Sequence, residues 1–237
     1  MIRLQGITKT YGSLRALDSL DLVVPAGKVM VFLGPNGAGK TTTLKICTGL
    51  VRADSGLVEI CGLPLNPDPV PARRLMGYVP DEPHLYEKLT GREFLWLSAR
   101  LHGLNPESCR HEVDVWTQRL DMGSYLDDLA EGYSHGMRQR VVLASALLHK
   151  PRVLIIDEPT VGLDPQNTRR AKDIFREMAR SGTAVLLSTH AMDLASEVGD
   201  EVAMLHRGRI LRQGPLDELR RSDQLEEVFL QLTREAR

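Results

Sequence analysis

Residues 29–43 constrain the fold of this chain more than any other stretch; they read VMVFLGPNGAGKTTT. The first five residues form an apolar run, which is typical of a strand buried on both faces of a parallel sheet. Gly34 to Thr41 then match the pattern G-x-x-x-x-G-K-[ST], and a helix is predicted over 42–50. Because glycines let successive backbone N–H groups point inward at a helix N-terminus, the pattern predicts a phosphate-binding loop. The plainer interpretation is a glycine turn that joins a core strand to a helix.

The residue types in this loop indicate how it would hold a nucleotide. Lys40 is expected to lie along the β- and γ-phosphates, and the hydroxyl of Thr41 is expected to bind Mg²⁺. Tyr11 lies in a predicted turn between strands at 2–8 and 20–24. It is either a ring on which adenine stacks or a half-buried tyrosine of a β-turn. The residues predicted to surround the phosphates are Gly34, Pro35, Asn36, Gly37, Ala38, Gly39, Lys40, Thr41 and Thr42.

Bulk composition argues against several classes of protein. The 237 residues suffice for one large domain, or for one domain with an inserted subdomain. The 30 basic side chains are balanced by 31 acidic ones, so overall charge does not favour nucleic acid or an anionic membrane as a partner. Cys47, Cys61 and Cys109 are far apart and form no CxxC pair, which argues against a disulfide framework or a zinc site and suits a reducing compartment.

The hydropathy pattern points to a partner for any membrane role. The first residues do not resemble a signal peptide, and no apolar run approaches about 18 residues. Any contact with a membrane is therefore expected to come through a second, membrane-spanning chain.

Strands and helices are predicted to alternate through most of the chain. Helices are expected at 165–180 and 192–199, and the alternation predicts right-handed crossovers and a mostly parallel α/β sheet. Residues 84–150 show helical periodicity with almost no strand pattern, so an all-helical insert is expected there. Residues 201–213 predict a hairpin that turns at Arg207 and Gly208. The strands predicted for the sheets are 29–33, 75–80, 152–156 and 183–187, with 55–61 as an edge strand.

A second group of candidate residues follows the strand predicted at 152–156. Residues 153–159 read VLIIDEP, so four apolar residues lead to Asp157 and Glu158 at the carboxyl end of that strand. Ligands of open parallel sheets bind at this edge. Asp157 is expected to hold Mg²⁺, and Glu158 to orient and deprotonate the water that attacks the γ-phosphate. A base in this position is typically worth about 10²–10⁴ in rate.

His190 follows the next predicted strand in the same way. Most single histidines are structural, and the other six histidines of the chain are interpreted so. His190 differs because the strand before it, 183–187, is expected to end at the same edge of the sheet as Glu158. It is predicted to donate a hydrogen bond to the γ-phosphate or to the attacking water.

Residues 133–137 read YSHGM and precede a predicted helix. Alone they indicate only a helix cap at Ser134. Together with the other motifs, they resemble the signature of the ABC-type ATPases, whose common form is LSGGQ. The resemblance covers nearly the whole chain, because each landmark of the family occurs in order. These landmarks are Tyr11, the phosphate loop, the loop after 78–80, the signature at 133–137, Asp157 with Glu158, the sequence Gly162-Leu163-Asp164, and His190.

The resemblance implies a fold and its division along the chain. The fold is a P-loop ATPase core of the ABC type, with a mostly parallel sheet, flanking helices and an antiparallel β part on the N-terminal side. A helical subdomain that carries the signature is inserted into this core. The implied segments are the first part of the core at 1–83, the helical subdomain at 84–150, the second part of the core at 151–215 and a helical tail at 216–237.

The resemblance also implies a shared site for ATP and Mg²⁺. Two copies of the chain would dimerise head to tail and enclose two ATP molecules. Ser134 and Gly136 of one copy would contact the γ-phosphate held by the loop of the other, and Asp164 would lie at the dimer seam. The implied catalytic residues are Glu158, His190 and Lys40.

Some residues depart from the common family pattern. Asp81 stands where many members have Gln, and it could reach Mg²⁺ through water. Tyr133, His135 and Met137 replace the usual Leu, Gly and Gln of the signature. The resulting form, YS-x-GMRQR, resembles the ABC-2 type branch, whose partners are usually exporters. An apolar stripe over 225–233 is similar to tails of that branch; it packs on its own domain or binds a partner.

The function implied is that of an ATP-binding and hydrolysing subunit of an ABC exporter. It would act at the cytoplasmic face of the membrane, with a separate permease docked on the helical subdomain at 84–150. The alternative is a soluble, non-transport ABC ATPase that acts as a scaffold or regulator. An unrelated P-loop kinase or GTPase is disfavoured, because the chain lacks the guanine-reading NKxD sequence and the signature and His190 would be unexplained.

Overall fold

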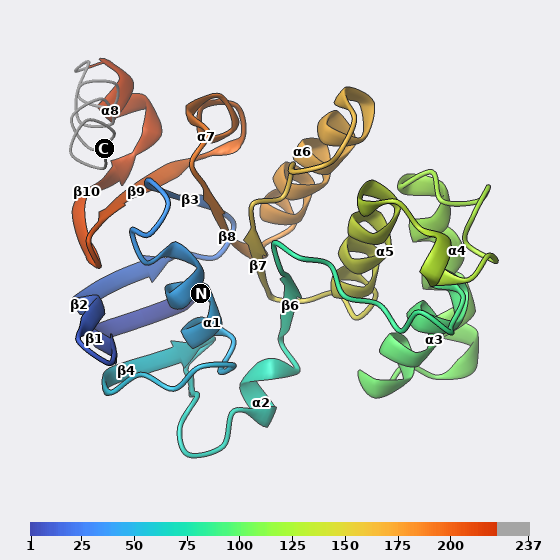
Figure 1. The fold of residues 1–237 in the computed structure, drawn as a ribbon, viewed down its shortest axis with the longest axis horizontal. Coiled ribbons are helices and arrows are strands. Elements are labelled where there is room, and N and C mark those ends of the chain that lie inside the picture. Colours follow the sequence, from blue (N-terminus) through green and yellow to red (C-terminus); the bar gives the residue numbers. More distant parts are fainter. Residues whose placement is uncertain (222–237) are drawn as a thin grey trace.

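The computed structural model describes residues 1–221 of the chain. In Figure 1 the β-strands lie in the left and central parts of the molecule, and helices α3 and α4 lie to the right of α5. The apolar stripe at 225–233 lies outside the described residues. Within residues 1–221, no helix combines the length and the apolar character needed to cross a membrane.

The central sheet has the strand order β10-β9-β3-β8-β7-β6. Its neighbours are parallel except β9 and β10, which form the hairpin predicted around Arg207 and Gly208. Every residue of β3, β7 and β8 is buried, because helices or a second sheet cover both faces. The strands are β3 (Val29–Leu33), β6 (Met76–Val79), β7 (Val153–Asp157), β8 (Ala184–Thr189), β9 (Glu201–His206) and β10 (Arg209–Pro215).

A second, antiparallel sheet is formed by the N-terminal part of the chain in the order β2-β1-β4-β5. The strands predicted at 2–8 and 20–24 are too short, because backbone pairing continues through polar residues and past register shifts. The edge position predicted for 55–61 is correct only in part, since β5 pairs with the last two residues of β4. The strands are β1 (Ile2–Tyr11), β2 (Leu14–Val24), β4 (Ser55–Ile60) and β5 (Leu63–Pro64).

Side chains of β3 alternate between two hydrophobic clusters, one on each face of the central sheet. Phe32 packs in the cluster shared with α1 and the antiparallel sheet. Val31 packs in the cluster shared with α6, α7 and the helical segment. Among these helices α6 has the predicted bounds, whereas α1 begins and ends earlier than the predicted 42–50. The helices around the sheets are α1 (Lys40–Cys47), α2 (Val70–Arg73), α6 (Pro165–Arg180), α7 (Met192–Val198) and α8 (Leu216–Arg221).

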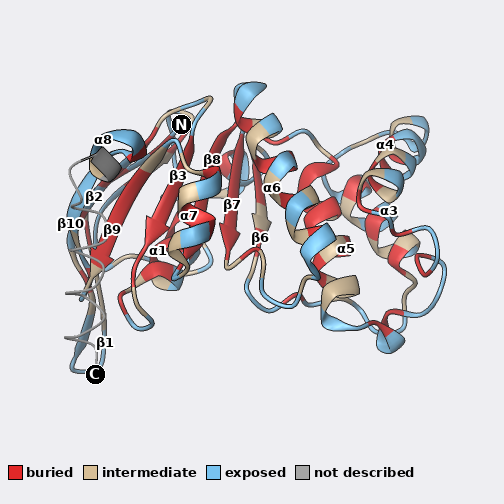
Figure 2. Ribbon diagram, turned by 90° about the horizontal axis from the view of Figure 1, so that it is seen from above, coloured by how far each residue is buried: buried red, intermediate tan, exposed pale blue. Residues whose placement is uncertain are grey.

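Helices make up the segment between β6 and β7. Thr90 and Glu93 form a capping box at the start of α3, and Asn105 caps α4. Helix α5 lies between the central sheet and α3 with α4, and its inward side is buried (Figures 1 and 2). The predicted fold class, an α/β core with a helical insertion, is confirmed. The elements are α3 (Gly91–Leu101), α4 (Pro106–Arg119), the 3₁₀ turn η1 (Ala130–Gly132) and α5 (His135–Leu147).

His149 joins this helical segment to the central sheet. Its ring stacks on that of His102, with centroids 3.6 Å apart, and its Nε2 lies 2.9 Å from the carbonyl oxygen of Met76 at the start of β6. Because a carbonyl only accepts, Nε2 carries the hydrogen and Nδ1 is left as the bare nitrogen. Nδ1 is buried and has no hydrogen-bond partner within residues 1–221. Burial, and then the neighbouring His102, lower the pKa of His149 to about 4.

This histidine is expected to make the fold sensitive to acid. Since the pKa of His149 is lower in the folded chain than in the unfolded chain, the unfolded chain binds the proton more readily, and stability is lost as the pH falls from about 6.5 to 4. His149→Phe retains a flat ring but cannot titrate. We expect the free energy of unfolding, measured with urea, to fall between these pH values by roughly 2 kcal/mol less in this variant than in the wild type.

The matched control is His84→Gln, whose histidine side chain is 86% exposed. This variant should follow the wild-type pH profile. Parallel profiles for His149→Phe and wild type would contradict the assignment.

Candidate functional site

The carboxyl ends of four neighbouring parallel strands bring the predicted site residues together. In the order β3-β8-β7-β6, the strands are followed by the phosphate loop, His190, Glu158 and Asp81. These residues are far apart in the chain, and the parallel register places them at one edge of the sheet.

Two glycines of the loop are required by close backbone contacts. A Cβ on Gly34 would lie 2.4 Å from the carbonyl oxygen of Leu205, and one on Gly39 would lie 2.7 Å from that of Ala16. Gly39 has a φ of 108° and precedes α1, which has no side-chain cap. The first N–H groups of α1 are therefore available to an anion, as the sequence pattern predicts.

Lys40 is buried within the loop that it belongs to. Its Nζ donates to the carbonyl oxygens of Gly34 at 2.7 Å and Pro35 at 3.3 Å, and lies 3.8 Å from Oε1 of Glu158. Burial lowers the pKa of Lys40, and the nearby carboxylates, Glu158 first, act in the opposite direction. The ammonium group thus lies between the loop carbonyls and the acidic end of β7.

Asp157 is a buried carboxylate with one committed oxygen and one free oxygen. The hydroxyl of Ser188 donates to Oδ1, whereas Oδ2 is buried and has no hydrogen-bond partner among residues 1–221. Thr41 and Asp81 line the same cavity of about 510 Å³ as Asp157. An unpartnered carboxylate oxygen beside a hydroxyl and a second carboxylate is a donor set that suits Mg²⁺.

Glu158 is held by two neighbours at the end of β8. Nδ1 of His190 lies 2.8 Å from Oε1, and the hydroxyl of Thr189 donates to Oε2 at 3.2 Å. The His190 side chain is 54% exposed and that of Glu158 only 13%. Both side chains are oriented, and the histidine faces solvent, where a substrate or water can reach it.

Asp81 lies within the electrostatic field of these acids. Its own burial is the largest cause of its raised pKa, followed by the charges of Asp157, Glu158 and Glu82; His135 acts in the opposite direction. The neighbouring acids therefore repel the charge of Asp81, and a bound cation would relieve that repulsion.

A cavity of about 580 Å³ adjoins the loop. It is lined by loop residues, by Lys40 and Glu158, and by Tyr11. The Tyr11 ring is exposed, at the end of β1, and Lys9 Nζ lies 5.4 Å from its centroid. Tyr11 is thus an exposed cavity residue at a strand end, which does not fit the half-buried turn residue that was one of its two interpretations.

Ser134, Gly136 and Asp164 line neither of these two cavities. Ser134 caps α5, where its hydroxyl accepts from the backbone N–H of Met137 at 3.3 Å. Asp164 caps α6, and both of its carboxylate oxygens accept from Asn167, which lowers its pKa. The helix-cap interpretation of Ser134 is confirmed. A role for these residues in nucleotide binding stays a prediction that needs a second copy of the chain.

The sequence analysis missed four residues of the site. Ser188 and Thr189 orient the two acids, and the register that pairs Asp157 with Ser188 would have revealed them. Arg15 near the start of β2 and Arg207 in the turn between β9 and β10 line the larger cavity. No local pattern marks these arginines, because only the folding of the hairpins brings them to the loop.

Comparison with known proteins agrees with this geometry. The family model described as ABC transporter matches residues 17–161. The daunorubicin/doxorubicin resistance ATP-binding protein DrrA of Streptomyces peucetius is 37% identical over 221 residues, which are 93% of this chain and 67% of that protein.

Solved structures show the same fold. An ATP-binding subunit of an ABC transporter superposes with a TM-score of 0.91 at 32% identity, covering 98% of this chain and 99% of that one. A dimeric ATP-binding cassette in a post-hydrolysis state, bound to ADP and Pi, superposes with a TM-score of 0.84 at 26% identity, covering 91% and 99% of the two chains. The phosphate loop, the acids beside it and these similarities lead to one conclusion: this chain belongs to the ABC transporter family, as one of its ATP-binding subunits.

Proposed function

We propose that this chain hydrolyses Mg-ATP at the carboxyl edge of its central sheet and thereby drives an exporter. The observation that carries the proposal is the line of contacts from Lys40 through Glu158 to His190, at 3.8 and 2.8 Å. Lys40 would bind the β- and γ-phosphates, and Glu158 would accept the proton of the attacking water. His190 would donate a hydrogen bond to the γ-phosphate or to that water.

The remaining loop residues would surround the nucleotide. The N–H groups at the start of α1 would bind the phosphates, and the exposed ring of Tyr11 would stack on adenine. Thr41, Asp157 and Asp81 would hold Mg²⁺, which would neutralise the phosphates. Within residues 1–221 no cluster of three or more His, Cys, Asp or Glu side chains is arranged to hold a metal ion. The Thr41 hydroxyl and the phosphate oxygens would therefore complete the coordination.

The site would be completed by a second copy of the chain. Ser134 and Gly136 lie at the N-terminal end of α5, where backbone N–H groups and the helix dipole would attract a phosphate. The dimeric cassette bound to ADP and Pi supports this arrangement. Each ATP would lie between the loop of one copy and the α5 end of the other, with Asp164 at the seam.

Glu158→Gln tests both hydrolysis and the shared site. The amide is nearly isosteric but cannot accept the proton, so phosphate release should slow by about 10²-fold or more. ATP binding should persist, and size exclusion with ATP should show a dimer. Lys40→Ala is the companion variant, in which calorimetry should find that ATP affinity is lost. A Glu158→Gln chain that stays monomeric with ATP would contradict the shared site.

Asp81→Asn tests the proposed metal site. Removing one carboxylate charge should weaken the dependence of ATP binding on Mg²⁺, because fewer anionic oxygens remain to hold the ion. Calorimetric titration of ATP with and without Mg²⁺ measures this, with Glu82→Gln as the neighbouring control, whose glutamate side chain is 84% exposed. Equal Mg²⁺ dependence in Asp81→Asn and the wild type would remove Asp81 from the metal site.

The transport partner is proposed to be a permease that docks on the helical segment at 84–150, at the cytoplasmic face of the membrane. The name of DrrA as a drug-resistance protein supports an export direction. Tagged chain purified in mild detergent from its own cells should carry a protein with several membrane spans. Recovery of water-soluble partners alone would favour the scaffold or regulator role.

A further inference from the structure

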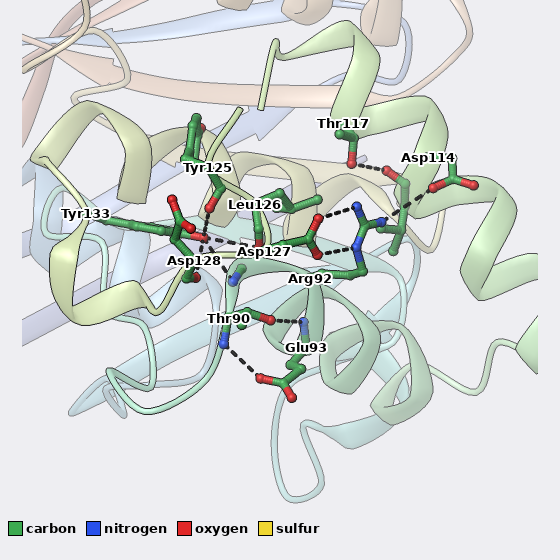
Figure 3. A network of polar contacts seen from close by, with 12 residues as sticks. Thr90, Arg92, Glu93, Asp114, Thr117, Tyr125, Leu126, Asp127, Asp128 and Tyr133 are labelled. Carbon is green, nitrogen blue, oxygen red and sulfur yellow. Dashed lines mark hydrogen bonds and ion pairs between the residues drawn. The ribbon is translucent and has the colours of Figure 1, made fainter. Parts of the chain in front are cut away.

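Tyr133 is buried, yet its hydroxyl lies in a group of backbone polar atoms (Figure 3). The hydroxyl accepts from the N–H of Gly91 at 3.0 Å. It lies 2.8 Å from the carbonyl oxygen of Tyr125, 3.1 Å from that of Asp128 and 3.3 Å from that of Leu126. Since a phenol carries one hydrogen, it donates to one of these carbonyls at a time, with the shortest distance to Tyr125.

This hydroxyl joins two segments of the helical insertion. Gly91 is the first residue of α3, and a Cβ there would lie 2.6 Å from the Tyr133 hydroxyl oxygen. The backbone N–H of the next residue, Arg92, donates to the carbonyl oxygen of Leu126. Its guanidinium donates to the carboxylate of Asp127, with Nε 2.7 Å from Oδ1. The hydroxyl thus occupies the space that glycine leaves, at the point where the start of α3 meets 125–128.

The main chain of Tyr133 leads directly into α5. Ser134 is the N-cap of that helix, and the Tyr133 carbonyl accepts from Nε of Arg138 at 3.2 Å. The ring is therefore anchored at its hydroxyl end to α3 and at its backbone end to the first turn of α5. Together these contacts set the position of the residues that follow.

We propose that the Tyr133 hydroxyl is a positioning group for the shared ATP site. It would touch no nucleotide. By fixing the start of α5 to the start of α3, it would set where Ser134 and Gly136 meet the phosphate held by the second copy. The inference rests on the shared site of the proposed function, and it adds a residue outside the atoms that contact ATP.

Tyr125 supplies a matched control within the same pair of rings. The two rings meet edge to face, with centroids 5.1 Å apart. The Tyr125 hydroxyl is also buried, but it has no hydrogen-bond partner within the described part of the chain. Removing this hydroxyl changes the same local core without breaking a hydrogen bond, whereas removing that of Tyr133 leaves the Gly91 N–H unpaired.

The experiment uses the full chain with Glu158→Gln, in which hydrolysis is slow. The ATP concentration for half-maximal dimer formation is measured by size exclusion with light scattering, and ADP affinity by calorimetry. Adding Tyr133→Phe should raise the ATP requirement by about tenfold. ADP affinity should stay the same, because the chain's own phosphate loop is unchanged. Adding Tyr125→Phe should change neither quantity.

A further variant separates positioning from loss of stability. Val113 is fully buried in α4, and Val113→Ala should lower the melting temperature without raising the ATP requirement. If Tyr133→Phe left the ATP requirement unchanged, this inference would be wrong but the shared site would stand. The same holds if Val113→Ala raised the ATP requirement as much as Tyr133→Phe does. Absence of an ATP-dependent dimer in Glu158→Gln itself would overturn the shared site and this inference with it.

Discussion

The rest of the site depends on the contacts of the buried ammonium group of Lys40. It lies 2.7 Å from the carbonyl oxygen of Gly34 and 3.8 Å from Glu158, and it offsets part of the charge of three acids at one edge. Within residues 1–221, one buried oxygen of Asp157 has no hydrogen-bond partner, and burial followed by the charges of the other two acids raises the pKa of Asp81. A bound divalent cation would reduce the repulsion among these carboxylates, so this edge of the sheet suits a metal bound together with a nucleotide.

The parallel sheet brings this charge together and also supports it. Strand β8 lies between β3 and β7, so its last residues face the loop on one side and the acids on the other. Ser188 and Thr189 then hydrogen-bond Asp157 and Glu158. The strands themselves are wholly buried between two apolar layers, so the orientation of each carboxylate is set by a rigid element and by a hydroxyl on the neighbouring strand.

Local sequence was enough wherever one segment determined its own structure. The run of apolar residues in β3 and the capped, amphipathic helix α6 have the predicted bounds, because burial on both faces or on one stripe leaves a clear period. The predicted bounds of β1 and β2 are too short. Backbone pairing between these two strands keeps their polar residues extended, although their hydropathy pattern does not indicate a strand there. Arg15 and Arg207 reach the cavity only because two hairpins fold over the loop. The helix cap at Ser134 could be predicted from the local sequence. The distance of Ser134 from the two cavities could not, because it follows from how α5 packs.

Helix α5 connects the two parts of the proposed site. Its first turn carries the signature, and the residue that follows its C-cap, His149, hydrogen-bonds to Met76 at the base of β6. The same short strand leads to Asp81 at its other end, and His135 in the first turn of α5 acts against the rise that burial and the neighbouring acids cause in the pKa of Asp81. A displacement of α5 would therefore move the groups proposed to meet the second copy's nucleotide and also disturb the strand that leads to Asp81. Because both depend on one helix, the proposed engagement of a second copy would be coupled to the arrangement of the acidic edge.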